Sequence, residues 1–202
     1  MQQTHDSYSL ILNVALELFT RKGYDGTSID DIRNAAGFRS KASLYTHFKG
    51  KEEVAKALQE KCEAELSKTL TAAYNGASPE ALKRFTRVGR AFIEWALNHP
   101  REYAFRYLRV QQEKLMSGEY AYLGETPSGE YTMMMDLLKE LRTRYPVRHV
   151  ADAALLSMMV GLISKAVVDQ ESFGNVIFEE RVRQLMEMCF GILFSESVPL
   201  AE

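Results

Sequence analysis

The amino-acid sequence predicts an all-α protein, and three of its features point to that class. Apolar residues recur every three or four positions through most of the chain, which is the spacing of one helix face. No segment of useful length alternates apolar and polar residues, as a half-buried strand would. The interruptions fall at glycine, proline, serine and asparagine, which end and begin helices. With 202 residues and 46% apolar side chains, the chain can build one or two small helical domains.

The first predicted helix covers residues 8–22, where six apolar residues share one side: Leu10, Ile11, Val14, Ala15, Leu18 and Phe19. A second, short helix should begin after Thr27 or Ser28, either of which can N-cap it. Asp30 and Asp31 would then lie in its first turn, where negative charge suits the helix dipole. We expect Gly37 to end this helix, because the residue just past a helix end often adopts the left-handed conformation.

A long helix over residues 51–74 should connect this N-terminal part to the rest of the chain. The clearest break follows at residues 75–79, where Gly76 can end one helix and Ser78 precedes Pro79 at the start of the next. The later elements are expected in this order: a helix from Leu82 to Ala96, an interruption at Pro100, a helix at 101–116, a loop at 117–130, and helices near 130–145, 148–170 and 178–195.

Two short helices joined by a glycine turn make a helix-turn-helix, whose second helix can enter the DNA major groove. Its basic side chains strengthen this interpretation. No acidic residue stands between Gly37 and Glu52, whereas the chain as a whole carries a formal charge of −2. The residues expected to contact DNA are Thr27, Ser28, Arg39, Ser40, Lys41, Ala42, Ser43, Tyr45, Thr46, His47, Lys49 and Lys51.

These residues would act in different ways. The small residues of 40–43 would let the helix backbone approach the groove, and lysine can reach guanine acceptors. Tyr45 is expected to face outward, since Leu44 and Phe48 already supply the apolar positions; the alternative is a surface tyrosine packed on the adjacent helix. His47 either donates to a phosphate or caps a neighbouring helix.

The remaining contacts are expected at the phosphates. Lys49 and Lys51 either bind backbone phosphates or are solvated lysines, which look the same in sequence. Lys51 begins a helix whose first turn favours acids, so a cation there needs another reason, such as DNA. Thr27 and Ser28 would offer hydroxyl and backbone N–H groups to a phosphate.

The order of several anchors resembles the TetR-type (tetracycline-repressor-like) transcriptional regulators over about the first sixty residues. These anchors are Leu10-Ile11, Ala15, Leu18-Phe19, Gly23-Tyr24, Thr27-Ser28-Ile29, Asp31-Ile32, Ala35-Ala36-Gly37, Ser43-Leu44-Tyr45, His47-Phe48-Lys49 and Lys51-Glu52. The segment between Gly37 and Leu44 departs from the family pattern by one extra residue. The start of the recognition helix, at Arg39, Ser40 or Lys41, therefore stays open.

The resemblance implies two domains and a dimer. Residues 1–50 would form the helix-turn-helix domain, and residues 51–202 a helical effector-binding and dimerisation domain with helix 51–74 as its connector. In such proteins the last two helices commonly pair with their copies in a four-helix interface. Both helices are apolar nearly all round here, so they must be covered on more than one side; the alternative is that they are central in a monomer core. The predicted interface comprises Leu155, Met159, Gly161, Leu162, Leu185, Met188 and Ile192.

The middle helices carry a group of aromatic and methionine side chains that could line an effector pocket. Aromatic rings give rigid apolar walls, and methionines adapt to irregular shapes. The group favours an apolar or aromatic effector over a sugar or a metal, although each residue alone could be ordinary core. Its members are Phe85, Phe92, Trp95, Tyr103, Tyr107, Tyr131, Met133, Met134 and Met135.

Other classes of site have little support. There is no GxSxG, phosphate loop or HExxH sequence, so we expect no enzyme and no cofactor. His99 and His149 stand alone, so no metal site is expected. Cys62 and Cys189 fall within helical patterns and are expected to be buried, reduced thiols.

The same features favour a cytoplasmic protein. Residues 1–9 lack the apolar core of a signal peptide. The most apolar run, Ala153–Val168, includes Ser157, Ser164 and Lys165 and is a poor membrane span. The prediction is a homodimeric, ligand-responsive regulator that binds double-stranded DNA, most often a repressor in such families. The alternative is a helical protein-interaction module without DNA binding.

Overall fold

The computed structural model describes residues 2–108 and 128–200 of the chain. Within these ranges every regular element is helical, and the only strand-like pairing is an isolated bridge between Val147 and Phe194. The all-α prediction is therefore confirmed. No helix in the described ranges is both long enough and apolar enough to cross a membrane.

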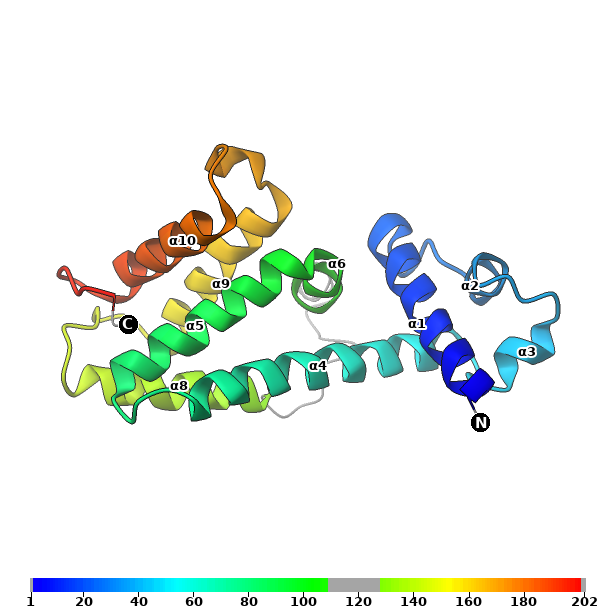
Figure 1. The fold of residues 1–202 in the computed structure, drawn as a ribbon, viewed down its shortest axis with the longest axis horizontal. Helices are drawn as coiled ribbons and strands as arrows, with labels where there is room; N and C mark the ends of the chain where they lie inside the picture. The colour runs from blue at the N-terminus through cyan, green and yellow to red at the C-terminus, as the bar shows by residue number, and fades with distance from the viewer. Residues whose placement is uncertain (1, 109–127, 201–202) are drawn as a thin grey trace. The chain divides into compact units, whose positions relative to one another are not determined.

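The described residues form two compact units. The first comprises residues 2–64 and 101–108, and the second comprises residues 65–100 and 128–200. Helix α4 (Lys51–Asn75) is one continuous element that contributes to both units (Figure 1).

The first unit contains α1 (Gln2–Lys22), α2 (Ile29–Ala35), α3 (Lys41–Tyr45), the beginning of α4, and the π-helical turn η1 (Ala104–Leu108). Helix α1 packs against both α2 and η1, and α2 contacts α3. The short helix α6 (Pro100–Tyr103) begins at the proline that the sequence marked as an interruption, a position where proline costs no hydrogen bond. The core of this unit is built from Ile11, Leu12, Ala15, Leu16, Leu18, Phe19, Ile32, Leu44, Phe48, Val54, Ala55, Leu58, Cys62 and Phe105.

Local sequence signals set the ends of α2. Ser28 is its N-cap, since its hydroxyl accepts from the Asp31 N–H while the Asp31 carboxylate accepts from the Ser28 N–H. Gly37 follows the helix with φ of +76°, a conformation that strains any residue with a Cβ. The predicted cap and the predicted stop are both confirmed.

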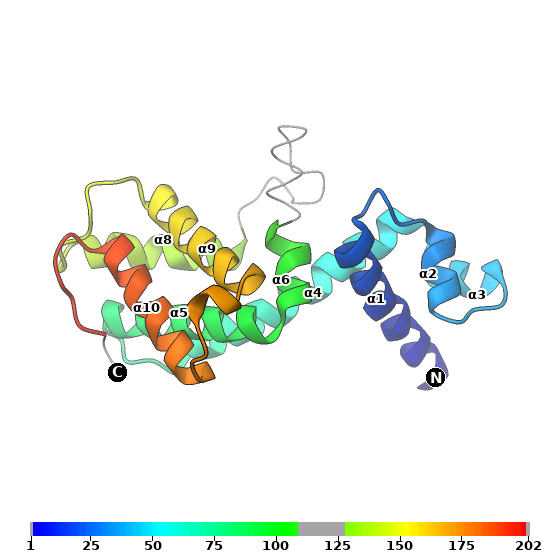
Figure 2. The ribbon, with the colours of Figure 1, turned by 90° about the horizontal axis from the view of Figure 1, so that it is seen from above.

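The second unit is a bundle around α5 (Ala81–Asn98). This helix contacts α8 (Gly129–Arg142), α9 (Asp152–Val168) and α10 (Phe178–Leu193), as Figures 1 and 2 show. A short 3₁₀ turn, η2 (Glu171–Phe173), lies between the last two helices. The buried residues of α5 include Leu82, Phe85, Val88, Ile93 and Ala96.

Two predicted helices are shorter in the structure. Helix α10 ends at Leu193 instead of 195, because Phe194 pairs with Val147 and the Arg148 N–H donates to the Leu193 carbonyl at 3.0 Å. Helix α9 begins at Asp152 instead of 148, and Arg142 Nε binds the Asp152 carboxylate at 2.7 Å. Residues 109–116 of the predicted helix at 101–116 and residues 117–127 of the predicted loop lie outside the described residues.

Candidate nucleic-acid interface

Helix α3, the predicted recognition helix, begins at Lys41, one of the three starts that the sequence left open. Ser40 is its N-cap and accepts a hydrogen bond from the Ser43 N–H at 3.3 Å. Leu44 is buried in the first unit, so the opposite side of this five-residue helix is left to solvent. The exposed residues here are Ser40, Lys41, Ala42, Tyr45 and Thr46, with Ser43 half-buried.

The two aromatic side chains after Leu44 lie in different environments. Tyr45 is 47% exposed, as expected for an outward-facing ring. His47 is half-buried, and its ring lies edge-on to Tyr8 at 6.5 Å between centroids. Tyr8 also stacks on the buried Phe48 at 4.9 Å, so α1 supports this end of the recognition segment. Sequence patterns did not reveal this support, because Tyr8 of α1 lies far from His47 and Phe48 along the chain.

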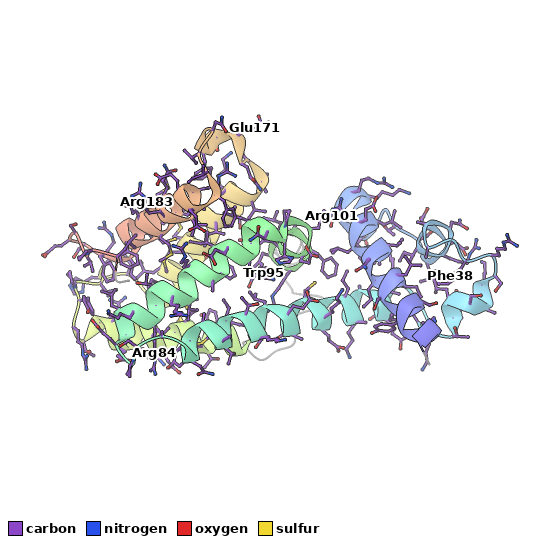
Figure 3. All side chains as sticks on the ribbon, viewed as in Figure 1. Phe38, Arg84, Trp95, Arg101, Glu171 and Arg183 are labelled. Carbon is purple, nitrogen blue, oxygen red and sulfur yellow. The ribbon has the colours of Figure 1, made fainter. Side chains whose placement is uncertain are left out.

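A charged network joins α2 to α3. Asp30 of α2 pairs with Lys41 at 2.9 Å and with Arg33 at 3.2 Å. Hydrogen bonds from Lys41 and then from Arg33 lower the pKa of Asp30, so the carboxylate stays ionised. The guanidinium of Arg33 also donates to the Phe38 carbonyl at 2.8 Å, across the turn in which Figure 3 shows Phe38. The turn between the two helices is therefore held by side chains as well as by Gly37.

The basic side chains differ in how freely they could meet a phosphate. Arg39 and Lys49 are exposed and form no ion pair with other residues that the structure describes. Lys51 is half-buried, and its ammonium donates to the Tyr24 carbonyl at 2.8 Å. Lys51 therefore has an internal partner that the sequence did not reveal, and its predicted phosphate contact stays a prediction.

Thr27 does not have the phosphate-binding role that the sequence suggested. Its side chain is only 1% exposed, and its hydroxyl donates to the Gly23 carbonyl at 2.7 Å. Its N–H donates to the Tyr24 carbonyl at 3.2 Å, so neither donor is available to a phosphate. Thr27 fastens the turn after α1, whereas the exposed Ser28 caps α2.

The predicted effector-pocket residues are divided between the two units. Tyr103 and Tyr107 belong to the first unit, where their rings stack at 4.8 Å. The other members belong to the second unit: Phe85 and Trp95 are buried, Phe92 and the three methionines Met133–Met135 are half-buried, and Tyr131 is exposed.

One open cavity of about 450 Å³ does include Trp95. It is lined by Glu65, Lys68, Thr69 and Ala72 of α4 and by Trp95 and His99 of α5. Figure 3 shows Trp95 on the side of α5 toward α4. The rings of Trp95 and His99 stack at 5.8 Å. Sequence reasoning missed the α4 face because its residues are exposed and three of the four are polar.

The predicted interface residues divide into two groups. Leu155, Met159 and Leu185 are buried within the second unit, which corrects their assignment to an intermolecular surface. Gly161 and Met188 are exposed, and Leu162 and Ile192 are half-buried. The neighbouring Met158, which was not in the predicted set, is 64% exposed.

Other chemistry has little basis in the described residues. No group of three or more His, Cys, Asp or Glu there could hold a metal ion. Cys62 and Cys189 are buried and form no disulfide in the described residues, and burial raises the pKa of the Cys189 thiol to about 12.

Comparison with known proteins supports the helix-turn-helix assignment. Residues 11–58 match the family described as bacterial regulatory proteins, tetR family. The negative transcriptional regulator IcaR of the Staphylococcus epidermidis biofilm operon icaADBC is 46% identical over 52 residues, which are 26% of this chain and 28% of IcaR. Its Staphylococcus aureus counterpart is 48% identical over 44 residues, 22% of this chain and 23% of that protein. These matches thus span about a quarter of each relative.

Solved structures resemble the chain over nearly all of its length. A tetR-family regulatory protein from Rhodococcus RHA1 superposes with a TM-score of 0.76 at 16% identity, covering 95% of this chain and 98% of that one. The ketosteroid transcriptional regulator KstR2 of Mycobacterium tuberculosis gives a TM-score of 0.74 at 19% identity, covering 94% and 95%. At such low identity the likeness shows a shared fold.

Proposed function

We propose that the chain is a TetR-type transcriptional regulator that binds double-stranded DNA through α3. The observation that carries this proposal is the exposed surface of that short helix. Small and hydroxyl-bearing residues there allow close approach to a groove, and Lys41 and Tyr45 add polar tips. The exposed cations of Arg39 and Lys49 flank this surface and would meet phosphates.

We further propose that the protein acts as a homodimeric repressor on a pseudo-palindromic operator. A single helix-turn-helix reads few bases, whereas a two-fold dimer reads two half-sites. The exposed side chains of Met158 on α9 and Met188 on α10 would supply apolar contact area, and the exposed Gly161 and Gly191 would let helices approach closely. The sign of regulation is inferred from IcaR, which is named as a negative regulator. A regulator of this kind would act in the cytoplasm.

The third part of the proposal is control by a small apolar or aromatic effector. The cavity beside Trp95 combines an aromatic ring with polar groups from α4. An effector can change DNA affinity only by binding the competent and incompetent shapes with different affinities. We propose a boundary at residue 50 between DNA-binding and effector-binding parts, with α4 connecting them.

Selection of bound sequences from a random pool of double-stranded DNA tests this function. The full-length protein should enrich one pseudo-palindromic sequence, and its affinity should fall steeply with salt because bound phosphates release counterions. Lys41→Ala should weaken that binding, whereas Lys139→Ala, an exposed lysine of α8 in the second unit, should leave it unchanged. A pool that shows no enrichment would favour the alternative, a helical protein-interaction module.

A further inference from the structure

The core of the first unit contains one side chain from far along the sequence. Phe105 of η1 is only 4% exposed and lies among the apolar residues of α1 and α4. Its ring stacks on Phe19 of α1, with 5.8 Å between centroids and planes inclined by 15°. The helix-turn-helix unit is therefore completed by residues outside its own segment of sequence.

The next residue, Arg106, links η1 to α4 through an ion pair. Arg106 is 6% exposed, and its guanidinium pairs with the Glu63 carboxylate at 3.6 Å. Successive residues of a helical turn point in different directions, so burial of both Phe105 and Arg106 means that η1 is covered on adjoining sides. Short π-helical turns such as this one are frequent at functional sites.

A continuous series of contacts leads from Phe105 to the helix-turn-helix. Phe19 contacts the ring of Tyr24 at 5.3 Å between centroids. Tyr24 belongs to the turn between α1 and α2, and its carbonyl accepts the hydrogen bond from Lys51 at the start of α4. The Phe105 ring thus supports the side of α1 from which the chain turns into α2.

We propose that Phe105 is a positioning residue for DNA binding, acting through Phe19 and Tyr24 on the orientation of α1 and α2. This inference rests on the proposed function. Removing the ring leaves a void beside Phe19, which packing of the remaining side chains fills only in part. Helices α1 and α2 then sample several orientations. The apparent affinity for DNA falls in proportion to the fraction of molecules in the orientation that can bind DNA. No phosphate contact is lost, so the dependence of affinity on salt keeps its slope.

The experiment measures operator affinity of full-length Phe105→Leu and Phe105→Ala by fluorescence anisotropy at several salt concentrations. The temperature is one at which circular dichroism shows each protein folded. Phe194→Leu is the matched control, since Phe194 is an equally buried phenylalanine in the second unit. We expect about tenfold weaker binding for Phe105→Ala, a smaller loss for Phe105→Leu, and the wild-type salt slope for both. If Phe105→Ala does not fold, the Phe105→Leu measurement decides.

A double-mutant cycle tests the route through Phe19. If Phe105 acts through that ring, Phe19→Leu combined with Phe105→Leu should lose less affinity than the sum of the two single losses. Folded Phe105 variants that bind as tightly as the wild type would overturn the inference, as would an equal loss of affinity in Phe194→Leu. A wild type that binds no DNA would instead refute the proposed function.

Discussion

The Lys51 ammonium donates to the carbonyl oxygen of Tyr24 at 2.8 Å and lies 4.0 Å from the centroid of the Tyr24 ring, across 27 residues of sequence. The contact joins the start of α4 to the turn between α1 and α2. A cation is unfavourable in the first turn of a helix, where the dipole is positive. The carbonyl and the ring offset that cost, so Lys51 has a structural reason for its place besides DNA.

Lys49 and Lys51 should therefore respond differently to substitution. Lys49→Ala should weaken binding to all sequences alike and reduce the slope of log affinity against log salt by about 0.9, since one phosphate contact is lost. Lys51→Met should keep the slope but lower the free energy of unfolding by about 1 kcal/mol, because it removes a hydrogen bond and a cation–π contact. Anisotropy titrations across salt and urea unfolding measure the two effects. A reduced slope in Lys51→Met would assign Lys51 to the DNA instead.

The cap of α2 should be visible in the titration of Asp31. The Ser28 hydroxyl, followed by the Ser28 N–H, lowers the pKa of this carboxyl from 3.8 to about 2. A lowered pKa in the folded state stabilises the fold above the unfolded value, and the contribution is lost as pH falls from about 4 toward 2. In Ser28→Ala the pKa should rise toward 3.8. The carboxyl carbon shift, followed by NMR from pH 1.5 to 6, measures it, and an unchanged midpoint would contradict the capping box.

Ser28 and Gly37 were predictable from sequence because a cap and a helix stop are local events. Each is decided by residues within about four positions. No spacing rule reveals the burial of Phe105 in the core of the first unit or the hydrogen bond from Lys51 to Tyr24. Both depend on contacts between segments that are far apart in the sequence. Thr27 shows a third case, since two adjacent residues could each cap α2 and only packing assigned one of them to the interior.

Helix α9 shows the same limit in another form. A helix that is apolar on every side carries no signal that separates the inner face from an exposed one. Met159 turns out to be buried and the adjacent Met158 exposed, although the two residues are chemically identical. The fold class was therefore predictable from periodicity, whereas the residues of a particular surface were not.

Substitution of these methionines should separate dimerisation from folding. Met158→Glu or Met188→Glu should convert dimers to monomers at micromolar concentration, since a charge in an apolar interface lacks a partner. Met159→Ala should leave the dimer intact but cost about 2–5 kcal/mol of stability, because it opens a cavity in the core. Sedimentation velocity and urea unfolding measure the two outcomes.

The control for this pair is Leu10→Glu. Leu10 is an exposed apolar residue of α1 in the first unit, so its substitution should not change the sedimentation of the dimer. A wild-type protein that sediments as a monomer at this concentration would refute the proposed assembly. Dimers that persist in both glutamate variants would place the interface on another surface.

Trp95 offers a direct test of effector control. It is the only tryptophan in the chain, it stacks on His99, and it lines the cavity between α4 and α5. A compound that binds there should quench or shift its emission and release operator DNA over the same concentration range. A coupling of about 1–3 kcal/mol, a typical value, would weaken DNA binding roughly 5- to 150-fold at saturation. Trp95→Phe should bind DNA like the wild type while losing the optical signal.

Thr69→Trp should block the cavity from the α4 side and weaken the compound's effect on DNA, because the larger side chain would fill the space that the ligand occupies. Compounds that change the emission without altering operator affinity would show that this cavity is not coupled to the DNA-binding surface.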